Sequence, residues 1–409
     1  MTLVQSFRGA VSGVEVRDAP EGVPAHDPGA PPELTASPAS AEEVAAVLGW
    51  AAQEGVGVLP LGTGSHAGPV TGGPYIVLET SRLEGIEEYE PADLTITART
   101  GTKFGVVDDA LRENGQWAPF DPPRVRERSL GGFVSDAQHA PLWAGYGALK
   151  NHVLGATVVT GDGRILRLGG KVVKNVAGYD LLRPVVGGRG RLGVVTSVCL
   201  RAFPIPSYER VLMITGANVP ELLEIALAVG TAPILPASIL VGGPLTTLEG
   251  RSALVLRLHG AQSTVAADQA TIEAHIGSSL EAVDGSVGKA DALLDELRDY
   301  GGVEPCGVEL SVLPSHLPEV LSVAADAGLS SLVADTYAGR IRIGSDRLDA
   351  RALHVVRAAA ESAGGAMRVV RWFGPDRPAG TPHRGAEVRL SDRLVSIFDP
   401  GGVLWPTRP

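Results

Sequence analysis

Cysteine is almost missing from this sequence of 409 residues. Cys199 and Cys306 lie far apart and form no C-x-x-C pair. Iron–sulfur clusters and structural zinc sites need several thiolates at close spacing, so the pattern argues against both. We expect two buried thiols that behave as small apolar side chains. Such scarcity fits a reducing compartment and favours a cytoplasmic location.

Long apolar runs are missing as well. No stretch approaches the roughly 20 apolar residues that a membrane span needs, and the opening MTLVQSFRGA has no run typical of a signal peptide. The 46 acidic residues outnumber the 35 basic ones, which gives a net charge of −11. A chain of this sign is a poor partner for a phosphate backbone. We therefore expect no transmembrane segment and no nucleic-acid partner.

The hydrophobic content, in contrast, is ample for a buried core, at 44%. The length predicts two or three domains. Residues 1–35 are rich in Pro, Gly and Ala and predict an irregular lead-in. Ser40 and Glu43 then form an S-x-x-E capping box, which predicts a helix that Gly55 ends. Further on we expect strands over residues 56–60, 75–78, 94–99 and 192–202, a helix over residues 104–114, and a hairpin over residues 152–168.

The second half has a different rhythm. We expect strands over residues 308–313, 330–336, 340–344 and 367–372, and helices over residues 316–327 and 350–362. That order, β-α-β-β-α-β, is ferredoxin-like. Residues 208–275 give a similar but incomplete order. Two such units can pair into one larger sheet with helices on one face.

Three glycine-rich segments carry the candidate chemistry of the first half. PLGTGSHAG (60–68) follows an expected strand, and its exposed backbone N–H groups can form an anion-binding concavity. SLGGFVSDAQHAP (129–141) again allows close backbone approach. GRGRLG (188–193) matches G-x-G-x-x-G, but a strand follows it, so no helix N-terminus can meet a pyrophosphate. Each of the first two segments, taken alone, is equally compatible with an ordinary turn.

Together, in this order and spacing, the three segments resemble the FAD-binding domain of the PCMH type, the vanillyl-alcohol oxidase/p-cresol methylhydroxylase family. The resemblance implies an α+β protein. A two-lobed FAD-binding domain (36–206) follows the lead-in (1–35), and a ferredoxin-like α+β cap domain (207–373) and a C-terminal segment (374–409) complete the chain. It also implies which residues bind the cofactor. They are Pro60, Leu61, Gly62, Thr63, Gly64, Ser65, His66, Pro122, Ser129, Leu130, Gly131, Gly132, Ser135, Asp136, Gly190, Gly193, Val194 and Val195.

The resemblance implies noncovalent FAD. Some relatives bond FAD to a loop histidine, but that position corresponds to Ser65 here, and His66 is one residue away. Two further departures stand out. Leu61 replaces a basic residue that is frequent in the family, and Arg189 replaces a glutamate that is common in its catalytic dehydrogenases.

One stretch narrows the resemblance. KVVKNVAGYDLLRPVVGGRGRLGVVT (171–196) resembles the FAD-binding E subunit of bacterial glycolate oxidase, and IFDPGGVLWPTR (397–408) resembles the closing segment of that family. The resemblance implies a catalytic flavoprotein subunit and an iron–sulfur subunit as partners, and a small hydroxy acid as substrate. Through such partners the chain would lie at the periphery of the inner membrane.

Three functions remain open: a flavin-bearing electron-transfer subunit of such a complex, a free-standing FAD-dependent oxidoreductase that acts on the CH–OH group of a small hydroxy acid or alcohol, and a scaffold that has lost its flavin. The metal-ligand motif H-x-G-D-G-N-x-H of catalytic relatives is absent, and no catalytic residue is assigned. We expect the chain alone to oxidise glycolate poorly. The basic candidates of the second half are compatible with solvated surface charges or with an arginine clamp that folding assembles: Arg342, Arg368, Arg371 and Arg384.

Overall fold

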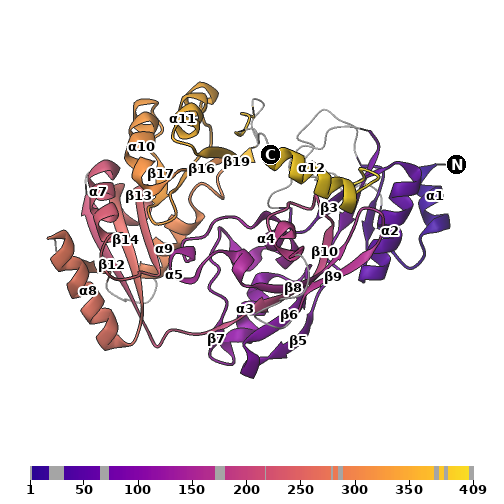
Figure 1. Ribbon diagram of the computed structural model, residues 1–409, viewed down its shortest axis with the longest axis horizontal. Coiled ribbons are helices and arrows are strands. Elements are labelled where there is room, and N and C mark those ends of the chain that lie inside the picture. Colours follow the sequence, from indigo (N-terminus) through magenta and orange to yellow (C-terminus); the bar gives the residue numbers. More distant parts are fainter. Residues whose placement is uncertain are drawn as a thin grey trace.

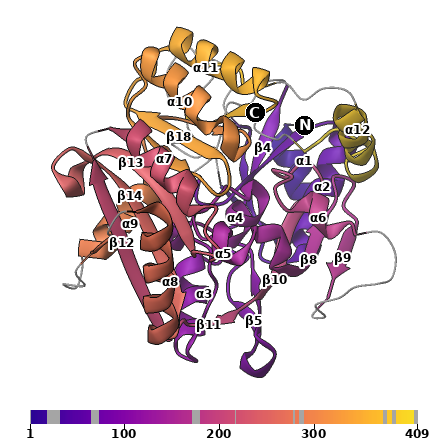
Figure 2. The same cartoon turned by 60° about the vertical axis from the view of Figure 1, so that its left-hand side comes forward.

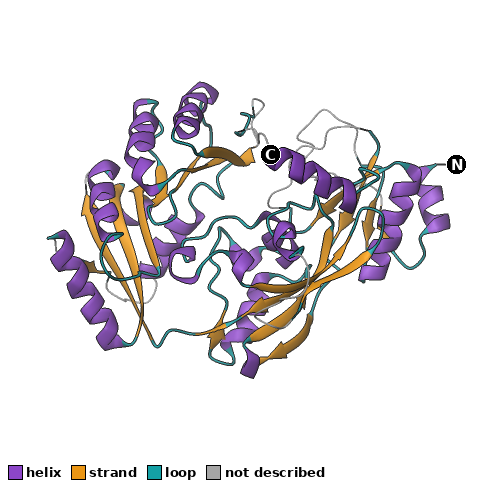
Figure 3. Cartoon of the chain, viewed as in Figure 1, coloured by secondary structure: helices purple, strands orange, loops and turns teal. Residues whose placement is uncertain are grey.

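The computed structural model describes residues 2–17, 32–64, 73–170, 180–216, 218–277, 280–283, 289–372, 377–381 and 386–404. The described chain contains both helices and strands, as the α+β prediction required (Figure 3). Two sheets of four and five strands and a two-stranded ribbon of β7 (Gln116–Trp117) and β11 (Phe203–Pro204) lie in the first half. One eight-stranded sheet lies in the second half (Figure 1). No helix in these described ranges is long and apolar enough to cross a membrane.

The first sheet has four strands in the order β1-β2-β4-β3. Strands β2, β4 and β3 run parallel, and β1 adds antiparallel at the edge. Helix α2 (Ala41–Glu54) begins at Ser40, whose side chain accepts the Glu43 N–H, and it ends at Gly55 in the left-handed conformation. The strand bounds are β1 (Glu15–Arg17), β2 (Thr35–Ser37), β3 (Gly57–Leu61) and β4 (Tyr75–Glu79).

The expected irregular lead-in is wrong for its first residues. They form helix α1 (Leu3–Ala10), which starts with a complete capping box between Thr2 and Gln5. The helix is held by tertiary contacts: Phe7 packs edge-on against Trp50, and Trp50 Nε1 donates to Ser6 Oγ. A short helix is marginal in isolation and depends on such packing.

The second sheet has five antiparallel strands in the order β5-β6-β10-β8-β9. The hairpin β8–β9 was expected, and β5 was not. Helix α3 (Phe104–Arg112) and the short helices α4 (Leu130–Asp136) and α6 (Leu182–Val185) contribute apolar side chains to the core on this sheet. The strand bounds are β5 (Ile86–Glu90), β6 (Thr95–Arg99), β8 (Val153–Val159), β9 (Ile165–Gly169) and β10 (Val194–Arg201).

The eight-stranded sheet confirms the double ferredoxin-like prediction. Its order is β15-β12-β14-β13-β17-β18-β16-β19, so each half of the sheet has the interleaved order of one β-α-β-β-α-β unit, and β13 and β17 join the units. The strand bounds are β12 (Tyr208–Gly216), β13 (Ser238–Leu245), β14 (Arg251–Gly260), β15 (Glu281–Ala282), β16 (Cys306–Ser311), β17 (Leu332–Asp335), β18 (Arg340–Ser345) and β19 (Ala366–Trp372).

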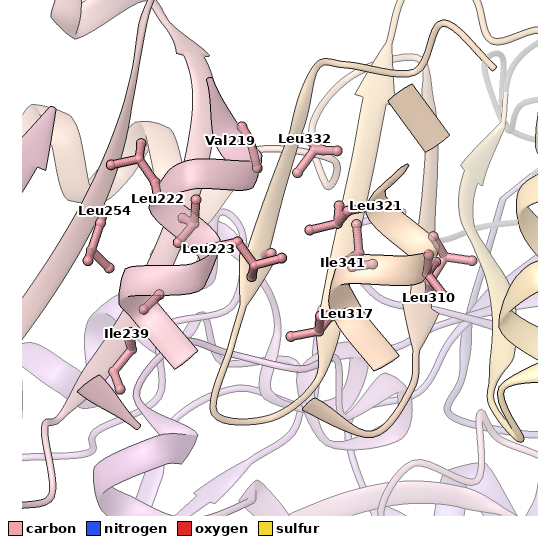
Figure 4. Close-up of a cluster of buried hydrophobic side chains, with 14 of the residues drawn as sticks. Val219, Leu222, Leu223, Ile239, Leu254, Leu310, Leu317, Leu321, Leu332 and Ile341 are labelled. Carbon is pink, nitrogen blue, oxygen red and sulfur yellow. The ribbon is translucent and has the colours of Figure 1, made fainter. Parts of the chain in front are cut away.

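Four helices cover the outer face of this sheet: α7 (Val219–Val229), α8 (Gln262–Ile276), α10 (Leu317–Asp326) and α11 (Ala350–Ser362). The turned view of Figure 2 brings this helical layer forward. Aliphatic side chains from both units meet beneath it, such as Leu223 and Leu317 (Figure 4). On the inner face, α9 (Lys289–Asp299) packs through Leu293 and Leu297 against the first unit and Val333.

The C-terminal segment returns to the first half. Helix α12 (Ala386–Phe398), which was not expected, brings Phe398 into the core of the five-stranded sheet. Beyond it, Leu404 forms a parallel bridge with Val58 of β3. Asp399 fixes this turn because its carboxylate accepts the N–H groups of Val403 and Leu404, both at 2.9 Å.

Both cysteines are buried, as expected. Cys199 lies in β10 with 7% of its surface exposed, and Cys306 in β16 with 3%.

Candidate functional site

The first glycine-rich loop leaves β3 and meets the second segment at Gly62. A Cβ atom at Gly62 would collide with Ser129 Oγ, so a larger residue there would displace the hydroxyl group that caps α4. Pro60 and Leu61 still belong to β3, and the Leu61 carbonyl accepts the Thr80 N–H at 2.9 Å. Thr63 and Gly64 turn outward and are exposed. Ser65 and His66, also predicted to bind the cofactor, lie outside the described residues.

The second segment is anchored on the loop after β6. Leu130 N–H donates to Thr102 O at 2.9 Å, and Gly131 N–H donates to Thr100 O at 2.8 Å. Gly132 N–H has only a long bond of 3.3 Å to Ser129 Oγ, which caps α4. Of the two glycine amides, that of Gly132 is therefore the easier for an anionic ligand to recruit.

The third segment docks on the second. Arg189 N–H donates to Ser135 O at 2.8 Å, and Gly193 lies against β8, where a Cβ would come within 2.6 Å of Val158 and Val159. Thr100 Oγ1 donates to Val195 O at 2.6 Å, so that carbonyl already has a partner. The structure thus brings together the described parts of all three predicted segments. The remaining predicted residues also lie in this region of the chain: Gly190 at a left-handed turn, buried Val194 in β10, and buried Pro122, whose carbonyl accepts the Val125 N–H.

Asp136, at the end of α4, is surrounded by arginines from both halves of the chain. Its carboxylate lies 3.4 Å from Arg128, 3.8 Å from Arg189 and 3.2 Å from Arg368. Arg128 is almost wholly buried, and burial lowers its pKa while the charge of Asp136 opposes that shift. Arg368 belongs to β19, so the predicted flavin segment is tied to the second half through this carboxylate.

Glu309 extends this network across the sheet. Its Oε1 atom lies 3.5 Å from Arg368 and 3.6 Å from Arg340. Burial by itself would raise the pKa of Glu309, but the charges of Arg368 and Arg340 outweigh it and hold that pKa below its usual range. The carboxylate is therefore ionised in a buried position at the junction of the two halves.

The strand pattern explains why these charges face inward. Val308 and Leu310 of β16 and Ile341 and Ile343 of β18 pack under the helices, so the alternate residues face the other side. Glu309 pairs in register with Arg342 on one side and with Arg368 on the other. Of the two interpretations left open for these arginines, that of solvated surface charges is wrong for Arg342 and Arg368.

Arg342 has a structural role. It is 3% exposed and donates to the carbonyls of Leu297, at 2.8 Å, and Arg298, so it caps the C-terminus of α9. Arg371 is only half-buried, and Arg384 lies outside the described residues. Within one sequence, alternation such as RIRIG indicates a strand with one apolar face, but it does not distinguish water from a second domain on the other face.

A second contact between the halves pairs His139, which follows α4, with Asp335 of β17. The two side chains are each 4% exposed, and His139 Nε2 lies 2.8 Å from Asp335 Oδ2. Asp335 also accepts the N–H groups of Tyr337 and Ala338. Within the described part of the chain, no group of His, Cys, Asp or Glu is arranged to hold a metal ion.

A separate cavity of about 260 Å³ lies between α3 and α9. Its apolar wall includes Phe104 and Leu240, and its charged groups are balanced, as in the ion pair between Arg257 and Asp121. None of the predicted flavin residues lines it. The cavity is therefore distinct from the convergence of the three glycine-rich segments.

Comparison with known proteins defines the class of the first half. Residues 32–169 match the family model described as FAD binding domain. The chain therefore carries an FAD-binding domain of the PCMH type, and FAD is its cofactor. The close approaches at Gly62 and Gly193 fit a site that needs bare backbone.

The particular relatives are oxidoreductases and their subunits. The chain is 42% identical over 139 residues to glycolate oxidase subunit GlcE of Escherichia coli, a match that covers 34% of this chain and 39% of that protein. It is 33% identical to D-2-hydroxyglutarate dehydrogenase of Xanthomonas citri, over 47% of this chain and 42% of that one. The matches thus span about two fifths of these curated relatives.

A solved structure covers much more of the chain. An alkyldihydroxyacetonephosphate synthase aligns with 92% of this chain and 76% of its own, with a TM-score of 0.68 at 16% identity. At this identity the likeness concerns the fold, and it includes the second half as well as the FAD-binding domain.

Proposed function

We propose that this chain is the FAD-binding subunit of a complex that oxidises glycolate or a related 2-hydroxy acid. One observation carries the proposal. The three glycine-rich segments, which contain Gly62, Ser129 and Arg189, meet in the structure and resemble flavin-binding segments. The segments of Gly62 and Ser129 lie within the matched FAD-binding domain. The similarity to a glycolate oxidase subunit supports the substrate class. The proposed partners are a catalytic flavoprotein subunit and an iron–sulfur subunit.

In this proposal the chain holds FAD without a covalent bond. The backbone of Gly62 to Gly64 and the amide of Gly132 bind the pyrophosphate, and residues 190–195 lie along the rest of the cofactor. When bound, the isoalloxazine accepts and passes on electrons, while the protein supplies binding, orientation and electrostatics. The buried positive charge around Asp136 favours an anionic ligand nearby.

The test is purification of the chain from its native host under gentle conditions, followed by subunit analysis and acid precipitation. We expect a yellow assembly of several subunits whose flavin stays in the supernatant after precipitation. Flavin in the pellet would refute noncovalent binding, and a colourless protein would refute the flavin role.

A free-standing oxidoreductase is the second candidate, and the buried cluster of Glu309 and arginines favours it. Oxidation of a 2-hydroxy acid needs a cation for the carboxylate and an acceptor for the hydroxyl proton, and the cluster contains both kinds of group. Steady-state assay of the FAD-loaded chain with glycolate and a dye acceptor separates the candidates. Turnover on the order of 1 s⁻¹ or more would favour the free-standing enzyme.

A further inference from the structure

The inner face of the eight-stranded sheet changes character at β17. Next to the first unit it is apolar and covered by α9, whereas on β16, β18 and β19 it carries Glu309, Arg340 and Arg368. Buried charges are costly unless they are paired or serve a ligand. Because Arg342 is accounted for by α9, the other three residues call for a separate explanation.

The cluster holds more positive than negative charge. Among the described residues, Arg128, Arg189, Arg340 and Arg368 form ion pairs with two carboxylates, those of Asp136 and Glu309. Burial lowers the pKa of Arg189 most, and the nearby charges of Arg368 and Arg377 lower it further. Arg377 therefore adds to the positive charge around the cluster. A buried surplus of this sign is stabilised by an anion.

Exposure shows which groups an entering molecule meets. The side chains of Glu309 and Asp136 are only 4% and 11% exposed, whereas those of Arg189, Arg368 and Arg340 are 22%, 24% and 35% exposed. The accessible part of the cluster is therefore guanidinium, with the carboxylates behind it.

Four polar atoms of the cluster lack hydrogen-bond partners among the described residues: Glu309 Oε2, Arg368 Nε, Arg128 Nε and Nε2 of Gln138, whose Oε1 accepts from Arg128. Buried polar atoms usually have partners, so four unpaired atoms in one network indicate contacts that the protein alone does not supply. Three of them are donors and one, on Glu309, is an acceptor. A ligand that offers partners to both kinds of group carries an anionic oxygen and a hydroxyl group.

We propose that Arg340 and Arg368 bind the carboxylate of a small 2-hydroxy acid and that Glu309 accepts a hydrogen bond from its hydroxyl group. The planar guanidinium fork suits a carboxylate, and Glu309 lies between the two arginines. This inference rests on the proposed function and deepens it, because it assigns an acid-binding site to this chain itself. The other occupant to be distinguished is FAD, whose own anionic groups could meet the same arginines.

The test is calorimetric titration of the FAD-loaded chain, kept reduced under anaerobic conditions so that nothing is oxidised, with glycolate and with acetate. We expect glycolate to bind more tightly than acetate. Arg340→Gln and Arg368→Gln should each weaken both acids at least tenfold, because Gln keeps much of the size but not the charge. Glu309→Gln should lower the preference for glycolate over acetate about tenfold, because the hydroxyl group of glycolate loses its charged acceptor.

Arg351→Gln is the matched control, since Arg351 is exposed at the start of α11 in the outer helical layer, and it should change neither affinity. FAD content and melting temperature are recorded for each variant. Arg340 is the more exposed of the two arginines, so Arg340→Gln keeps the test valid if Arg368→Gln fails to fold.

The outcomes separate the inference from the proposed function. A yellow chain that binds no glycolate, or whose arginine variants bind it normally, overturns the inference and leaves the flavin role intact. Variants that lose FAD instead of glycolate also overturn it and assign the arginines to the cofactor. A chain that takes up no FAD but binds glycolate through these arginines overturns the proposed function and retains the acid site.

Discussion

At the residue scale, the glycines of the flavin segments matter because they have no side chain. Gly62 lets the first loop lie against Ser129, and Gly193 lets β10 begin beside Val158. The sequence predicted close backbone approach at these glycines, but to a ligand, and their packing against Ser129 and Val158 is seen only in the structure. The buried charges were not predictable. Arg368 donates a hydrogen bond to Asp136, which is 232 positions away in the sequence, and no local pattern predicts a contact over such a separation.

Gly62→Ala should therefore weaken FAD binding at least tenfold, about 1.4 kcal/mol, because its Cβ collides with Ser129 Oγ and forces the segments apart. Adding Ser129→Ala removes the colliding atom. The double variant should bind FAD as well as Ser129→Ala alone, and fluorescence titration of FAD measures all three. Equal FAD affinity of Gly62→Ala and the unmodified chain would contradict the packing argument, and Gly9→Ala, with open space around it, serves as the control.

At the scale of elements, the double β-α-β-β-α-β pattern could be predicted because each unit alternates apolar strands with amphipathic helices over short range. The missed elements have a common physical reason. Helix α1 has only two buried residues, and α12 depends on Phe398 reaching a core built mostly by residues 96–202. Both are stabilised by distant packing, which local propensity does not show.

Arg342 illustrates how one side chain connects two elements. Arg342→Met should lower the free energy of unfolding by about 2–4 kcal/mol, because the carbonyls of Leu297 and Arg298 lose buried donors. Urea unfolding measures the change. The exposed Arg351→Met should stay within about 0.5 kcal/mol of the unmodified chain. A similarly small effect at Arg342 would show that α9 needs no such cap.

At the scale of the whole molecule, the two halves are joined by polar side-chain contacts as well as by the continuous polypeptide. Tyr146 bonds to His259 at 2.8 Å, His259 lies 2.7 Å from Glu209, and Arg257 links Glu209 with Asp121. Burial alone would raise the pKa of Glu209, but His259 and Arg257 outweigh it and lower the pKa to about 2.

A depressed pKa stabilises the folded state where the unfolded carboxyl group is also ionised. The contribution of Glu209 is therefore complete well above its ordinary pKa of 4.5 and is lost as the pH falls toward 2. Glu209→Gln should lower the melting temperature at pH 6, and the difference from the unmodified chain should narrow by pH 3. Glu224→Gln, at an exposed position on α7, should show no such narrowing. A gap that stays constant with pH would exclude this carboxylate as a pH-dependent link.

The return of Phe398 and Leu404 to the first half has a consequence for biosynthesis. The ribosome makes the strands of the FAD-binding domain first, yet the residues that complete their cores emerge only after the whole eight-stranded sheet has been translated. At about 5–20 residues per second, nearly 200 intervening residues take roughly 10–40 s. Throughout that interval the nascent first half exposes the apolar surface that α12 will cover. Chaperone demand should therefore be concentrated on this half, and it should end when the last turn of α12 leaves the exit tunnel.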